Sequence, residues 1–244
     1  MKNSKIKSLI LLTFFAVFTS CSNDDIVFDP FFDVDDAAEV IAASMAVTTY
    51  GAVDNMNYVS DQIVGILDCG ESRSETRSDS ESANNVNITV SYTISETYAL
   101  SCPNEEEQIN YTFTADQTTT SNPLNTDHNI IADWAITGAE ISSNTLTYNG
   151  NYTRSGEWIY NNQTNHIDTA TASFSYENVK ASKEDGVIFE GTSSFQLDGT
   201  STVYDPYSYQ GNIVFQEGNI AIVTFSTGEQ YEINLNNGDV TPLQ

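Results

Sequence analysis

The segment Val86-Asn87-Ile88-Thr89-Val90-Ser91-Tyr92-Thr93-Ile94-Ser95 alternates strictly between apolar and polar side chains. Successive side chains of a β-strand point to opposite faces, so this pattern predicts a strand with one apolar face and one wet face. Val, Ile, Tyr and Thr also suit a half-buried pleated surface. We therefore expect an antiparallel strand with its polar face toward water.

The same alternation recurs along the chain as far as residue 235. Turn signals such as Asp185-Gly186, Asp198-Gly199 and Asn237-Gly238 separate the segments, and short loops between consecutive strands mean antiparallel neighbours. The pattern predicts a meander of about 9–11 strands. The apolar positions are Ile109, Tyr111, Phe113, Ile130, Ala132, Trp134, Ile136, Leu146, Tyr148, Tyr152, Ala170, Ala172, Phe174, Tyr176, Val187, Phe189, Phe195, Leu197, Tyr209, Ile213, Phe215, Ile220, Ile222, Tyr231, Ile233 and Leu235.

Three glycines follow a weak repeat within this region, aromatic-x-Gly and then a small polar residue. They are Gly150, Gly191 and Gly211. A glycine inside a strand often marks a bend, a bulge or a close approach of two backbones. We interpret the three as residues that curl the sheet.

Helical periodicity replaces alternation before the sheet. Asp35 or Asp36 is a candidate N-cap for a first helix that Gly51 ends, and a second helical stripe ends near Cys69-Gly70. Residues 71–85 are rich in Ser, Glu and Asn and predict a loop.

These segments predict an α+β fold, in which an N-terminal helical hairpin (33–70) packs on a large curled antiparallel β-meander (71–244). Residues 33–244 would form one folding unit, because the apolar face of the sheet needs a cover.

The N-terminus has the form of an export signal. Lys2, Lys5 and Lys7 precede an apolar run, Leu9–Phe18, which is too short to span a membrane. Phe18-Thr19-Ser20-Cys21 then resembles the lipobox of bacterial lipoproteins. The resemblance implies that 1–20 are a lipoprotein signal peptide and that Cys21 carries the lipid. The alternative is an ordinary cleaved signal with an incidental cysteine.

Residues 21–32 form an acidic tether. Ser22-Asn23-Asp24-Asp25 and the acids that follow resemble the surface-export tag of Bacteroidota lipoproteins. This implies a lipid-anchored protein of the outer membrane, on the cell surface. If the segment is only a solvated linker, the protein faces the periplasm.

The charge of the chain restricts its partners. The 244 residues include 34 acidic and 8 basic ones. Three of the basic residues lie in the signal, so five against 34 leave a mature net charge of −29. Such a surface repels phosphate backbones, and we expect no nucleic-acid partner. It also repels anionic headgroups, so the membrane contact would be the lipid anchor.

Two cysteines remain after Cys21. In an oxidising compartment Cys69 and Cys102 predict a disulfide, which would close a loop of about 33 residues. The alternative is a pair of free, buried thiols.

Catalytic motifs are absent from the sequence. There is no G-x-S-x-G, no H-E-x-x-H and no calcium loop. The two histidines, His128 and His166, lie among Asn, Thr and Asp, which indicates exposed loops. We therefore expect no catalytic residue, no metal and no cofactor, although a surface hydrolase stays open.

Two clusters suit sugars, because aromatic rings stack on pyranose rings and amides bind hydroxyls. The first is Trp158, Tyr160, Asn161 and Asn162; the second is Tyr204, Tyr207 and Tyr209. The plainer interpretation is half-buried strand aromatics. Asp168-Thr169-Ala170 also resembles the Bacteroidota O-glycosylation acceptor, with Thr169 as the modified residue.

The expected function is a non-enzymatic binding or scaffold module on the outer surface, with a glycan or an envelope protein as partner. The alternative is an envelope carrier of a lipid or other apolar ligand, resembling the half-barrel lipoprotein carriers. An empty apolar cavity would favour the carrier, and a filled interior the binding module.

Overall fold

The structure is a computed structural model that describes residues 32–62, 68–83, 88–103, 107–121, 124–140, 142–161 and 166–243. The expected signal peptide, the expected lipidation site Cys21 and nearly all of the expected tether lie outside these residues. The elements are α1 (Val34–Met45), a 3₁₀ turn η1 (Val47–Thr49), α2 (Ala52–Gln62), β1 (Ser72–Ala83), β2 (Ile88–Ser101), β3 (Gln108–Thr120), β4 (Leu124–Thr137), β5 (Thr145–Tyr160), β6 (Ile167–Ser182), β7 (Ile188–Ser201), β8 (Tyr207–Gln216), β9 (Ile220–Phe225), β10 (Gln230–Asn234) and β11 (Val240–Leu243).

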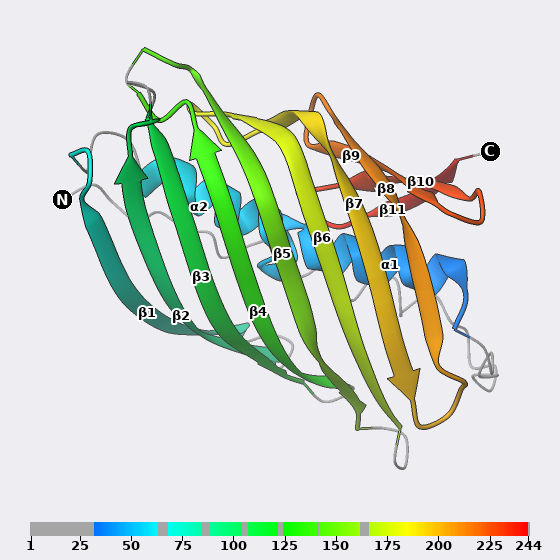
Figure 1. Ribbon diagram of the computed structural model, residues 1–244. Coiled ribbons are helices and arrows are strands. Elements are labelled where there is room, and N and C mark those ends of the chain that lie inside the picture. Colours follow the sequence, from blue (N-terminus) through cyan, green and yellow to red (C-terminus); the bar gives the residue numbers. More distant parts are fainter. Residues whose placement is uncertain are drawn as a thin grey trace.

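One 11-stranded antiparallel sheet dominates the described residues, with the strands in chain order from β1 to β11. The expected α+β class is wrong, because two short helices beside this sheet make a predominantly β fold. The sheet curls around the helices (Figure 1). Helical residues and the inward side chains of the strands share one hydrophobic core.

The helices do not form the expected hairpin. The start of α1 lies near β8, where the Tyr209 hydroxyl donates to the Phe32 carbonyl at 2.9 Å. At the far side of the sheet, Tyr58 of α2 donates to Glu75 of β1 at 3.2 Å. The two helices therefore follow one another across the sheet (Figure 1). The physical reason is the width of the inner face. Two helices side by side in a hairpin would cover only one part of this face and would leave the apolar side chains of the other strands exposed to water.

The start of α1 is capped by Asp33 rather than by Asp35 or Asp36. Asp33 accepts from the backbone N–H groups of Asp35 and Asp36, and the Asp36 side chain accepts in return from the backbone N–H of Asp33. This reciprocal arrangement is a capping box. In the described part of the chain, neither helix has the length and apolar character needed to span a bilayer.

Alternation is visible in the burial of the central strands, as in β3, where Ile109, Tyr111, Phe113 and Ala115 point inward. The largest fully buried side chain is Trp134. Its ring centroid lies 5.7 Å from those of both Tyr111 and Tyr148. The inner side of the sheet is thus filled with aromatic rings.

The loop expected over residues 71–85 is instead strand β1 over most of its length, so this prediction is wrong. All residues of β1 except Ala83 are polar, so it has no alternation of apolar and polar side chains. It pairs in register with β2, and hydroxyl pairs join the outer faces of the two strands, such as Ser74 with Thr97 at 2.8 Å. Backbone pairing and these side-chain hydrogen bonds hold β1 in the sheet, where the central strands also bury an apolar face.

The residues of β9 that face the core also differ from those expected. Ala221, Val223 and Phe225 are buried, whereas Ile220 and Ile222 face outward. Both sets of side chains are apolar, so the pattern of this short strand does not distinguish its two faces.

Two of the three repeat glycines lie at irregularities of the ladder. Gly150 has a φ of 134° at a register shift between β5 and β6. Gly191 has a φ of 127° opposite a second shift, between β6 and β7. A Cβ on Gly150 would also overlap the Asp133 carbonyl. Gly211 has no positive φ and lies against the Phe195 ring.

The disulfide is confirmed. Cys69 and Cys102 are bonded, with their Cα atoms 5.8 Å apart. It joins the segment before β1 to the end of β2.

Candidate functional site

Five polar features of the described residues are candidates for function. Three lie on the inner face beneath the helices, and two are grooves on the outer face.

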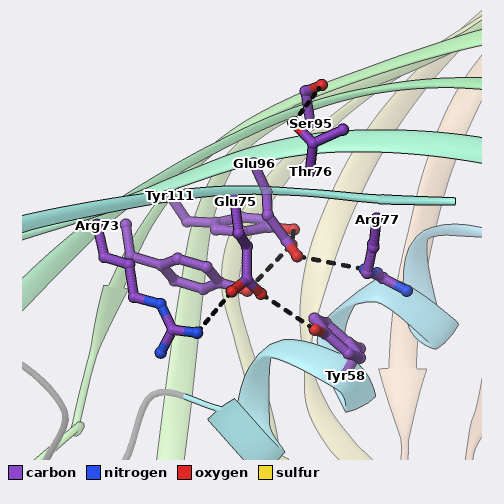
Figure 2. Close-up of polar contacts among 9 residues, drawn as sticks. Tyr58, Arg73, Glu75, Thr76, Arg77, Ser95, Glu96 and Tyr111 are labelled. Atoms are coloured by element: carbon purple, nitrogen blue, oxygen red, sulfur yellow. Dashed lines mark hydrogen bonds and ion pairs between the residues drawn. The ribbon is translucent and has the colours of Figure 1, made fainter.

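The first is a carboxylate cluster between α2 and the β1 edge (Figure 2). The Glu96 side chain is fully buried and accepts from Tyr111 at 2.7 Å and from Tyr98 at 3.0 Å. Arg77 Nε donates to it at 3.2 Å, and the Arg77 guanidinium lies 3.7 Å above the Tyr58 ring of α2.

Glu96 has a clear effect on the phenols that it binds. Burial, and then the Glu96 carboxylate, raise the pKa of Tyr111 far above its ordinary value. The same two causes raise the pKa of Tyr98. Both phenols therefore remain hydrogen-bond donors, and the cluster joins α2 to the first strands.

The second feature is Arg154 of β5, which is buried under the end of α1. Its guanidinium donates to the carbonyls of Ala43 at 2.8 Å and Thr49 at 3.2 Å. It also lies 2.9 Å from His128 Nδ1. A cation at a helix C-terminus satisfies the last carbonyls and complements the helix dipole.

His128 is buried in β4, so the expectation of an exposed loop is wrong for this residue. Burial first, and then the Arg154 charge, lower its pKa to about 2. It is neutral at physiological pH and acts as an acceptor for Arg154. The ring of Trp158, one of the predicted ligand residues, lies 4.6 Å from the His128 ring.

The third feature is a tyrosine cluster around His166 and Asp168. His166 is also buried, against expectation, and its Nε2 lies 3.0 Å from Asp168. The Tyr204 hydroxyl donates to Asp168 at 3.0 Å, and Tyr160 stacks on the His166 ring at 4.1 Å. Burial, then Asp168, raise the pKa of Tyr160 and that of Tyr204.

The structure brings the two predicted sugar clusters together at this point. Tyr160 comes from the first cluster and Tyr204 from the second. Tyr207 stacks on Phe32 at 3.6 Å, and Tyr209 lies beside the same ring. Their ring faces are thus in contact with other rings. Asn161 is exposed and donates to the Ser121 carbonyl at 2.9 Å, and Asn162 lies outside the described residues.

The fourth feature is an open groove of about 600 Å³ across the outer face of β5–β8. Outward side chains of these strands line it, and none of the lining residues is charged. They are Asn151, Thr153, Ser173, Phe174, Ser175, Ser194, Phe195, Gln196, Gln210, Gly211, Asn212 and Ser226. The two phenylalanines are buried, so the side chains that open onto the groove are those of serine, threonine, asparagine and glutamine.

A second groove, of about 630 Å³, crosses the outer face of β1–β4. Its lining includes Asp133 together with Ser and Thr residues. Thr169 also lies on the outer face, where its hydroxyl is 2.6 Å from that of Thr200.

The polar groups of these features form hydrogen bonds and ion pairs. Among the residues that the structure describes, no three His, Cys, Asp or Glu side chains gather as metal ligands would. The inner clusters hold helices to the sheet, and the outer groove offers neutral donors and acceptors to solvent.

Comparison with known proteins adds no relative: the chain matches no protein-family model, no curated protein and no solved structure.

Proposed function

We propose that this protein is a lipid-anchored, non-enzymatic binding module of the outer cell surface, and that the outer groove of β5–β8 takes an uncharged polar ligand of the glycan class. The groove lining carries the proposal. It presents amides and hydroxyls and no charge, on a chain whose formal net charge is −26. Sugar hydroxyls are both donors and acceptors, as are these side chains.

The filled inner face supports a surface-binding role over a carrier of apolar ligands. Trp134, Tyr111 and Tyr148 are fully buried where a carrier would need an empty apolar cavity. The polar side chains of the groove are on the opposite face.

A glycan array with purified protein tests the proposal. We expect retention of a neutral glycan, and loss of that retention in Ser194→Arg, which places a long side chain in the groove without changing the core. Thr118→Arg, on the outer face of β3 outside both grooves, is the matched control. Absence of glycan binding, or binding that Ser194→Arg leaves intact, would contradict the proposal.

The location is tested separately. Protease treatment of intact cells should remove the protein if it is anchored on the outer surface. Survival in intact cells, with digestion only after the outer membrane is opened, would place it in the periplasm. Replacement of Cys21 by Ser should release the protein from membranes.

A further inference from the structure

β1 forms an edge of the sheet that is suited to pairing. In the part of the chain that the structure describes, no strand pairs with its outer side (Figure 1). It is 12 residues long and contains no proline. The opposite edge, β11, has only 4 residues and includes Pro242. Long edge strands without such protection are templates for another strand.

The backbone groups of alternate residues point toward the open side. The N–H of Leu100 donates to the Glu71 carbonyl at 3.0 Å, which fixes the phase of the β1–β2 ladder. Residues 73, 75, 77 and 79 then direct their backbone groups to β2. Ser72, Ser74, Thr76, Ser78 and Ser80 direct theirs to the open edge. Close hydroxyl pairs such as Ser80 with Ser91, at 2.9 Å, agree with this phase.

The charges of β1 are self-complementary about Thr76. If two copies pair antiparallel with Thr76 opposite Thr76, Arg73 faces Asp79 and Glu75 faces Arg77. Serines face serines, and the outward-directed backbone groups meet. A two-fold axis on Glu75 would place Glu75 opposite itself, and an axis on Arg77 would place Arg77 opposite itself. Opposite charges across strands stabilise a pair and like charges destabilise it, which disfavours both of these axes. An axis on Ser74 also joins unlike charges, Arg73 with Glu75. It overlaps only residues 72–76 of the strand, whereas the axis on Thr76 overlaps residues 72–80.

Residues 72–80 also form a locally neutral edge. They carry two arginines and two acids, on a chain with 34 acidic residues in total. Two copies of so acidic a protein repel each other over most of their surfaces. Arg73 forms an ion pair with Glu75 of its own strand at 2.6 Å, and 50 % of its side chain remains exposed at this edge.

We propose that two copies of this chain pair through β1, antiparallel about Thr76, and form one continuous sheet across a two-fold axis. An isologous contact of this kind closes after two copies. The axis stands perpendicular to the sheet, so both outer grooves face the same side. The proposal does not depend on a ligand for either groove.

Sedimentation velocity on the exported chain carrying Cys21→Ser, which removes the lipid acceptor, measures the association. Arg73→Asp places a second carboxylate opposite Asp79, and Asp79→Arg places two guanidinium groups opposite each other. Because each change acts at two symmetry-related positions, we expect each to raise the dimer dissociation constant at least about tenfold. The double variant should restore it. A mixture of the two single variants should form heterodimers, because both pairs between positions 73 and 79 across the axis then join unlike charges.

Two further variants separate pairing from net charge and folding. Lys180→Asp changes the net charge as Arg73→Asp does, on the outer part of β6 rather than on β1, and should leave association unchanged. Thr76→Pro removes an N–H that points to the open edge and should give monomers with an unchanged unfolding midpoint. A chain that stays monomeric at low salt and high concentration, or a dimer indifferent to Arg73→Asp and Thr76→Pro, would overturn the proposal.

Discussion

Residues that break the alternation explain how this sheet holds its helices. Glu96 is in phase with Ile94, Arg154 with Tyr152, and Asp168 with Ala170, so each charged side chain lies on the buried face. Each meets hydrogen-bond partners there: phenols and Arg77 for Glu96, helix carbonyls for Arg154. A charged residue at a strand position where the alternation calls for an apolar residue is thus the sequence signal that could have located the inner clusters.

Glu96→Gln tests how much the carboxylate cluster contributes to the free energy of unfolding. The change keeps the shape but leaves Arg77 without its buried counter-charge, and we expect the free energy of unfolding to fall by about 3 kcal/mol. Denaturant unfolding measures it. Glu190→Gln, which breaks the exposed pair with Lys180 at 2.9 Å, is the control and should cost less than about 1 kcal/mol. Equal effects of the two changes would contradict the role given to Glu96.

His128 predicts a pH dependence of stability. Its pKa is lowered to about 2 in the folded protein, against an ordinary value of about 6.5 when unfolded. As the pH falls, His128 is therefore protonated in the unfolded chain before it is protonated in the folded one. The contribution of neutral His128 to the free energy of unfolding is complete above pH 6.5 and is lost as the pH falls toward 2. Between pH 7 and pH 5 the wild type should lose about 2 kcal/mol more than His128→Gln. Parallel pH profiles of the two proteins would contradict this.

At the scale of elements, the sequence pattern did not predict the edge strand β1 or the path of the chain between α1 and α2. β1 has no apolar alternation because its pairing relies on backbone and hydroxyl bonds. The 3₁₀ turn between α1 and α2 ends at Tyr50, with a φ of 55°, and leads into a second helix that continues across the sheet. The central strands, by contrast, followed their alternation, because one face of each is buried against the helices.

The disulfide between Cys69 and Cys102 is an element-level constraint on β1 and β2. Replacement of both cysteines by serine should lower the free energy of unfolding by about 3 kcal/mol, since the unfolded chain regains the freedom of a loop of 33 residues. Chemical denaturation with and without a reductant measures this. The wild type under reducing conditions should match the double variant; a wild type insensitive to the reductant would contradict the prediction.

At the scale of the whole molecule, we predict that residues 33–244 unfold as one unit. The helices and the sheet share one core, and neither buries its apolar face without the other. Far-ultraviolet and near-ultraviolet circular dichroism should therefore report one coincident transition. Loss of helical signal in a separate, earlier transition would show that α1 and α2 dock independently.

Local alternation was enough to predict the antiparallel meander, and chemistry alone was enough to pair Cys69 with Cys102. Alternation depends on near neighbours, because side chains two apart share a face of a strand. The disulfide could be predicted because only two cysteines follow Cys21. The path of α1 and α2 across the sheet, the burial of His128 and His166, and the meeting of Tyr160 with Tyr204 depend instead on how widely separated strands curl toward one another. That curvature sums small twists over the whole sheet, so no single segment of the sequence contains it.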